Sequence, residues 1–111
     1  MDEDRRKMPR TKRRLLVRFR RVDEERYHSA FTADAGPAGL FIVTSSIETA
    51  GTSLWIEIEM PTKKMLVLRG NVCWNRKVPV EIRSLEKTGF GVQLTEAPEE
   101  WYLFFMNPDN S

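Results

Sequence analysis

The sequence has little of several residue types on which catalytic and metal sites are usually built. Cys73 is the only cysteine, so no disulfide can form within the chain, which suits a reducing compartment. His28 is the only histidine, and no set of cysteines and histidines has the spacing of a metal site. A Gly-Lys-Ser/Thr phosphate loop is also lacking. We therefore expect no metal, no cofactor and no catalytic activity.

The two reactive side chains fit structural roles. His28 falls in an expected strand with no partner near it in sequence, so we expect a surface or edge histidine rather than a general base. Cys73 lies next to Trp74 in another expected strand, on the opposite face, and no basic cluster is near to activate its thiol. We expect a small buried or edge residue there.

Long apolar segments are lacking as well. No apolar run approaches the roughly 18 residues that a membrane span needs. The N-terminal Met-Asp-Glu-Asp-Arg-Arg has no apolar core of a signal peptide. With 111 residues the sequence fits one domain. We expect a cytoplasmic protein with no membrane partner.

Acidic residues are missing from one stretch. Residues 5–21 hold ten Lys/Arg and no Asp/Glu, whereas residues 22–111 hold eight Lys/Arg and thirteen Asp/Glu. A basic arm on an acidic body indicates a localised anionic partner, although a solvated tail would have the same composition.

What the sequence does have is alternation of apolar and polar residues with period two. It predicts strands near residues 15–20, 54–60, 66–74 and 90–94, with less regular strands at about 26–32 and 39–44. Leu66, Leu68, Gly70, Val72 and Trp74 are expected to share one face. Only residues 97–106 have a helical pattern, in which Trp101, Phe104 and Phe105 share one side. The pattern favours an all-β barrel or sandwich with a short C-terminal helix.

Two short polar segments remain to be explained. Arg5, Arg6 and Arg10 come just before the first strand, and the guanidinium fork suits phosphate oxygens or guanine O6 and N7. Asp34, which could accept the guanine N1–H, begins a turn that ends at Gly39, where the chain lacks a side chain and a ligand or another backbone can come close.

In their order and spacing these segments resemble the PilZ domain, a bacterial family that binds the second messenger cyclic di-GMP. Arg6-Lys7-Met8-Pro9-Arg10 matches its Arg-x-x-x-Arg motif, and Asp34-Ala35-Gly36-Pro37-Ala38-Gly39 matches its Asp-x-Ser-x-x-Gly motif. The sequences Gly39-Leu40-Phe41-Ile42, Gly70-Asn71-Val72-Cys73-Trp74 and Gly89-Phe90-Gly91-Val92-Gln93-Leu94 also look like the family's strands. The resemblance covers nearly the whole chain.

The resemblance implies a six-stranded antiparallel β-barrel with a helix at its C-terminal end. Residues 1–13 would be a flexible basic arm that folds over the barrel when ligand binds, residues 14–106 the barrel with its helix, and residues 107–111 a tail. Arg6, Arg10, Asp34, Gly36 and Gly39 would bind the ligand, and Arg5, directly before the first motif, implies two stacked ligand molecules. The implied role is a receptor in motility or biofilm regulation whose altered surface is recognised by a downstream protein.

The sequence departs from the family at Gly36, where the family usually has Ser. The missing hydroxyl costs about 1 kcal/mol of binding, or roughly fivefold in affinity. Two alternatives stay open. One is a degenerate PilZ domain that acts as a ligand-independent interaction module. The other is a small nucleic-acid-binding barrel that uses the basic arm, against which the acidic body and the lack of an aromatic ladder argue.

Overall fold

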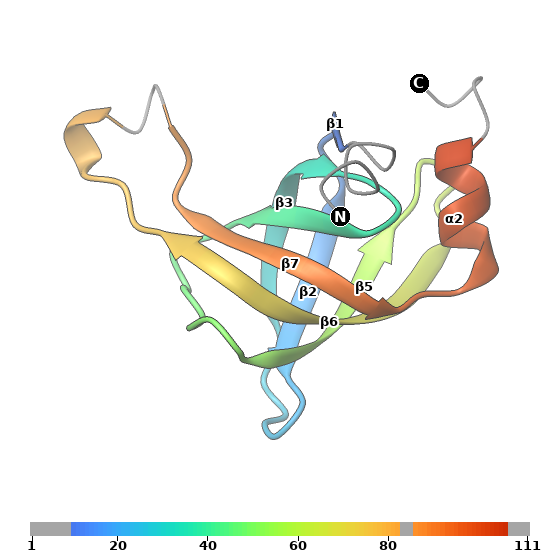
Figure 1. The fold of residues 1–111 in the computed structure, drawn as a ribbon, viewed down its shortest axis with the longest axis horizontal. Helices are drawn as coiled ribbons and strands as arrows, with labels where there is room; N and C mark the ends of the chain where they lie inside the picture. The colour runs from blue at the N-terminus through green and yellow to red at the C-terminus, as the bar shows by residue number, and fades with distance from the viewer. Residues whose placement is uncertain (1–9, 83–85, 107–111) are drawn as a thin grey trace, which may run out of the picture.

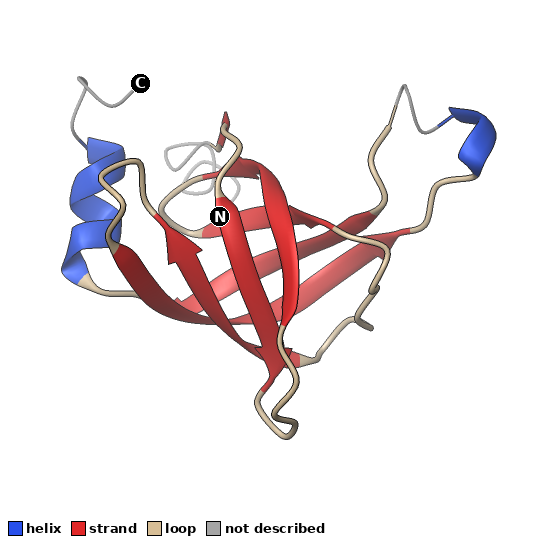
Figure 2. Cartoon of the chain, turned by 180° about the vertical axis from the view of Figure 1, so that it is seen from behind, coloured by secondary structure: helices blue, strands red, loops and turns tan. Residues whose placement is uncertain are grey.

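The computed structural model describes residues 10–82 and 86–106. Its elements are β1 (Thr11–Lys12), β2 (Leu16–Arg21), β3 (His28–Ala35), β4 (Gly39–Val43), β5 (Ser53–Glu59), β6 (Met65–Arg76), a 3₁₀ turn η1 (Val80–Ile82), β7 (Gly89–Glu96) and α2 (Glu99–Met106). The barrel strands wrap around a common interior, and α2 lies at one side of it (Figures 1 and 2).

The six longer strands form a closed antiparallel barrel. The order β3-β2-β5-β6-β7-β4 returns to its start because β4 also pairs with β3. The short strand β1 lies outside this ring and pairs with the end of β3. Closure removes the exposed edges that an open sheet would present. The expected fold class, an antiparallel barrel with a short C-terminal helix, is confirmed.

The alternating pattern identifies the barrel interior. On β2, Val17 and Phe19 are almost fully buried, whereas their neighbours Leu16 and Arg18 face outward. Strand β5 follows the same rule. The interior side chains are those of Leu15, Val17, Phe19, Leu40, Ile42, Leu54, Ile56, Ile58, Leu66, Leu68, Val72, Phe90, Val92 and Trp101, with others at the rim. Burial of this apolar surface is the main force that holds the barrel together.

Strand β6 departs from the predicted alternation at Cys73. The register of β6 against β7 shifts between Val72 and Trp74, so Cys73 is an extra residue and Trp74 pairs with Gly91. A bulge of this kind turns the following side chain to the other face. Trp74 was expected beside Val72, and that prediction was wrong: Trp74 is 41% exposed and stacks on Phe41 with ring centroids 5.2 Å apart. Cys73 is exposed.

Helix α2 packs one face against the barrel, as the sequence predicted. Trp101 is fully buried in the core cluster, and Phe104 and Phe105 pack against it. Glu99 and Glu100 lie in the first turn, where carboxylates complement the helix dipole. Within residues 10–82 and 86–106, no helix combines the length and the apolar character that crossing a membrane requires.

Candidate functional site

The second motif forms the hairpin between β3 and β4. The Gly36 N–H donates to the Gly39 carbonyl at 2.9 Å, which leaves Pro37 and Ala38 as a two-residue loop. The register between β3 and β4 shifts between Thr32 and Asp34, after which Asp34 pairs with Phe41. Asp34 is therefore placed at the end of β3, next to the hairpin, with its side chain partly exposed.

Strand β1 brings Arg10, the last residue of the first motif, to the same place. Thr11 pairs with Ala35 and Lys12 with Asp34, so Arg10 lies directly before a segment fixed on β3. The Arg10 Nε and the Asp34 Oδ1 are 3.4 Å apart, and the two side chains are 35% and 36% exposed. The last arginine of one motif and the first residue of the other therefore form an ion pair. Arg10, Asp34, Gly36 and Gly39 make up what we call the motif site.

The Asp34 carboxylate is only partly satisfied. Its Oδ1 atom is buried and accepts no hydrogen bond from the residues that the structure describes, because Arg10 approaches it at ion-pair distance without hydrogen-bond geometry. A buried acceptor that lacks a donor costs about 1–3 kcal/mol. An N–H group of a ligand could remove this cost.

Thr32 fixes β1 relative to β2. It is almost fully buried; its hydroxyl donates to the Arg13 carbonyl at 2.6 Å and accepts from the Leu15 N–H at 2.9 Å. These bonds bridge the interruption between the two strands, so the chain stays beside β3 from Thr11 to Phe19. Sequence analysis missed this residue, because a threonine in an apolar strand has no distinctive pattern.

Two further arginines follow the first motif and contact aromatic rings. The Arg14 guanidinium lies 4.0 Å from the centre of the Phe31 ring, and the Arg13 guanidinium lies 4.8 Å from that of Phe104. Phe31 is 39% exposed on β3. Such contacts hold guanidinium groups in place on the barrel surface. The sequence indicated Arg13 and Arg14 only as part of the basic stretch, residues 5–21.

The two glycines of the second motif have different surroundings. A Cβ atom on Gly39 would lie 2.5 Å from the Val92 carbonyl oxygen, so another backbone, that of β7, requires this glycine. Gly36 is not in the left-handed region; of the glycines in the described ranges, Gly51 is the one with a positive φ. The predicted ligand residues Arg5 and Arg6 lie outside the described residues, as do most of the predicted arm, residues 1–13, and the predicted tail.

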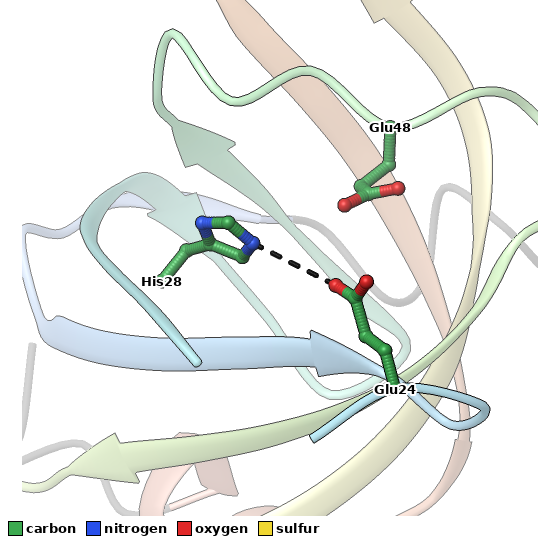
Figure 3. A group of neighbouring side chains, drawn as sticks. All are labelled: Glu24, His28 and Glu48. Carbon is green, nitrogen blue, oxygen red and sulfur yellow. Dashed lines mark ion pairs between the residues drawn. The ribbon is translucent and has the colours of Figure 1, made fainter. Parts of the chain in front are cut away.

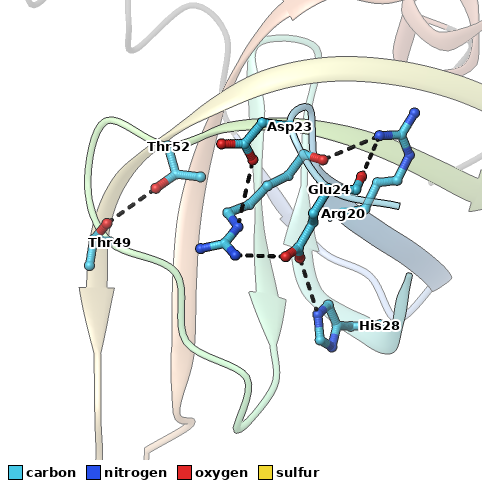
Figure 4. A network of polar contacts seen from close by, with 7 residues as sticks. Arg20, Asp23, Glu24, His28, Thr49 and Thr52 are labelled. Atoms are coloured by element: carbon cyan, nitrogen blue, oxygen red, sulfur yellow. Dashed lines mark hydrogen bonds and ion pairs between the residues drawn. The ribbon is translucent and has the colours of Figure 1, made fainter. Parts of the chain in front are cut away.

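A second polar cluster lies at the opposite end of β3 (Figure 4). His28, for which we expected no partner, has its Nε2 atom 3.7 Å from the Glu24 Oε1, and its ring stacks on Phe19. Arg21 donates from Nη2 to the Glu24 Oε2 at 2.6 Å. This hydrogen bond is the main cause that lowers the pKa of Glu24. The turn between β2 and β3 places these groups together.

The fold is that of a PilZ-like barrel: six antiparallel strands closed into a ring, one short strand outside it and a C-terminal helix. No family model and no curated protein matches the sequence. Among solved structures, the fold is similar to that of the Bacillus subtilis inhibitor of motility MotI/DgrA, with a TM-score of 0.73 and 17% sequence identity. The match covers 92% of this chain and 49% of that protein, so the chain spans about half of its length.

Proposed function

We propose that this chain is a PilZ-family receptor for cyclic di-GMP that carries out no catalysis. The observation that carries the proposal is the ion pair between Arg10 and Asp34, one residue from each motif, which lie 24 positions apart in the sequence and meet at one point on the barrel. A chance match to either short motif would not require that they meet in space.

Each group has a chemical role in the proposal. The Arg10 guanidinium offers a planar fork to a phosphate or to guanine O6 and N7. The Asp34 Oδ1, which lacks a donor among the described residues, accepts from guanine N1–H and the amino group. Four peptide units separate Arg6 from Arg10, so their Cα atoms are at most about 14 Å apart in any conformation. Arg6 is therefore within reach of the same ligand.

The proposed output is a changed surface that a downstream protein recognises. MotI/DgrA is described as an inhibitor of motility, and the likeness of fold supports motility control as the process. The ligand would compete with Arg10 for Asp34 and so rearrange the segment in front of β1. The partner would detect this rearrangement.

Titration calorimetry with cyclic di-GMP tests the proposal. We expect Arg10→Ala to weaken binding by about 100-fold, because truncation of a charged contact costs roughly 3 kcal/mol. Stability should change by less than about 1 kcal/mol, since the pair is partly exposed. Arg26→Ala is the matched control, an exposed arginine in the turn at the other end of β3. If Arg10→Ala binds as the parent does, or if the parent binds nothing, the proposal fails and a ligand-independent interaction module is favoured.

Asp34→Ala tests the recognition of guanine. We expect it to weaken cyclic di-GMP binding more than cyclic di-AMP binding, because only guanine presents an N1–H to the carboxylate. Equal losses for both nucleotides would show that Asp34 shapes the hairpin and does not contact the base.

Arg5 bears on the number of ligands. We propose two molecules per chain, since a third guanidinium can stack on a second nucleotide. In the same calorimetric series Arg5→Ala should bind one. A parent protein that binds a single molecule would contradict this role and leave that of Arg10 intact.

A further inference from the structure

Three side chains that can bind a metal come together at the end of the barrel opposite the motif site. Glu24 lies in the turn before β3, His28 begins β3, and Glu48 lies in the connection from β4 to β5. One ligand atom from each can be chosen so that all lie within 4.8 Å of one another. Figure 3 shows the three side chains turned toward a common space. We call them the Glu48 cluster.

Glu48 is the unusual member of the cluster. Its side chain is buried, with 8% of the residue exposed. The Asn75 side chain donates to the Glu48 backbone carbonyl at 3.1 Å, but within residues 10–82 and 86–106 no hydrogen bond or ion pair reaches the Glu48 carboxylate. A buried carboxylate with no hydrogen bond and no cation in direct contact is costly. A cation in the common space would remove that cost.

The other two groups are held in position to share the cation. Arg21 occupies the Glu24 Oε2, which leaves the Oε1 facing the His28 Nε2 at 3.7 Å. The His28 ring is fixed by stacking on Phe19, at 5.2 Å between centroids. Their side chains are 24% and 27% exposed, so an ion can enter from solvent. Partners of this kind orient metal ligands and preserve their geometry.

We propose that the Glu48 cluster is a binding site for a divalent transition-metal cation of the Zn²⁺ type. The ligands are the His28 Nε2, the Glu24 Oε1 and one Glu48 carboxylate oxygen, with water in a fourth position. Bonds of about 2.0–2.2 Å in a tetrahedral site place ligand atoms about 3.4 Å apart, so side-chain rotation has to close the present spacing. An imidazole beside two carboxylates favours Zn²⁺ over Mg²⁺ or Ca²⁺, which prefer oxygen ligands alone. The site is independent of the proposed nucleotide binding.

Titration of the metal-free protein, residues 1–111, with ZnCl₂ tests the proposal by calorimetry. We expect one Zn²⁺ per chain and a higher melting temperature at saturation. Glu48→Gln and His28→Phe should each weaken binding by about 100-fold or more, since loss of a direct ligand exceeds the 10- to 100-fold effect of an outer partner. Phenylalanine preserves the ring that stacks on Phe19, and circular dichroism confirms that both variants are folded.

Two matched controls locate the ion. Glu96→Gln removes an exposed carboxylate on β7, and Cys73→Ser removes the exposed thiol, so both should bind as the parent does. No Zn²⁺ binding by the parent, or unchanged binding by folded Glu48→Gln and His28→Phe, would overturn the proposal. So would loss of binding in Cys73→Ser, or Mg²⁺ binding as tight as that of Zn²⁺. Glu48→Gln should bind cyclic di-GMP to the same extent as the parent does. The metal test therefore gives the same answer whether or not the motif site binds the nucleotide.

Discussion

Strand β3 has a cluster of charged groups at each end. The two clusters differ in what lies beside the carboxylate that each contains. At the motif site Asp34 faces Arg10 across a half-exposed ion pair. At the Glu48 cluster a buried carboxylate faces a second carboxylate and a histidine. The first site has a cation that a ligand can compete for, whereas the second has negative charge in excess. The first therefore suits an anion that brings its own N–H donors, and the second a cation.

The two sites also differ in how the chain builds them. The motif site depends on a tight hairpin and on the pairing of β1 with β3. The Glu48 cluster takes only His28 from a strand. Glu24 and Glu48 come from two connections, which tolerate substitution better than paired backbone. Substitutions at the motif site should therefore have the larger effect on stability, and the predictions below test this difference.

The largest effect is expected at Gly39. A methyl group there meets the Val92 carbonyl oxygen at 2.5 Å, so β4 and β7 have to separate. Gly39→Ala should lower the free energy of unfolding by about 3 kcal/mol in urea denaturation. Ala38→Ser, at an exposed position in the same hairpin, should change it by less than about 0.5 kcal/mol. A Gly39→Ala protein as stable as its parent would mean that the glycine does not serve the approach of β7.

A smaller effect is expected at Gly36. Because its φ lies outside the left-handed region, a side chain there adds no strain of that kind. Gly36→Ser should tighten cyclic di-GMP binding about fivefold through one restored hydrogen bond, equivalent to about 1 kcal/mol. Ala38→Ser places a hydroxyl two residues later and should leave the affinity unchanged. If both variants bind as the parent does, the hydroxyl does not reach the ligand.

The smallest expected effect is in the pH dependence of stability at the Glu48 cluster. Burial is the main cause that raises the pKa of Glu48; Glu24 and Asp23 add to it, while Arg21 and His28 oppose it. A raised folded-state pKa contributes stability below the unfolded pKa, and this is lost as the pH rises through the folded value. In Glu48→Gln the side chain at this position is uncharged at every pH. The stability of this variant relative to the parent should therefore increase as the pH rises above about 4, in buffers with EDTA. A difference that does not vary with pH would contradict the burial of a titrating carboxyl.

The barrel strands could be predicted from the sequence wherever buried and exposed residues alternate without interruption. Alternation identified Val17 and Phe19, or Leu54 and Ile56, as interior residues because a strand with one buried face permits no other pattern. The rule failed at Trp74, since a single extra residue at Cys73 reverses the faces, and no local signal marks a bulge.

The two sites also differ in how far the sequence predicted them. The proposed ligand residues of the motif site were identified from a resemblance to a family, and the structure shows Arg10 and Asp34 in contact. The sequence did not indicate Glu48, because His28 and Glu24 lie 20 and 24 positions earlier, at the start of β3 and in the turn before it. Contacts between separate connections depend on how the barrel closes, which composition and periodicity do not determine.

Thr32 connects two strands, β1 and β2, that we expect to separate from β3 at different free-energy costs. Strand β1 pairs two residues with β3, whereas β2 pairs with both β3 and β5 inside the closed ring. We expect the backbone amides of β1 to exchange with solvent through local opening, and those of β2 only through global unfolding. The buried Thr32 hydroxyl, which is hydrogen-bonded to the Arg13 carbonyl and to the Leu15 N–H, therefore lies at the boundary of the part of the barrel that unfolds as one unit. We therefore expect the segment that carries Arg10 to detach from the surface and return while the barrel stays folded.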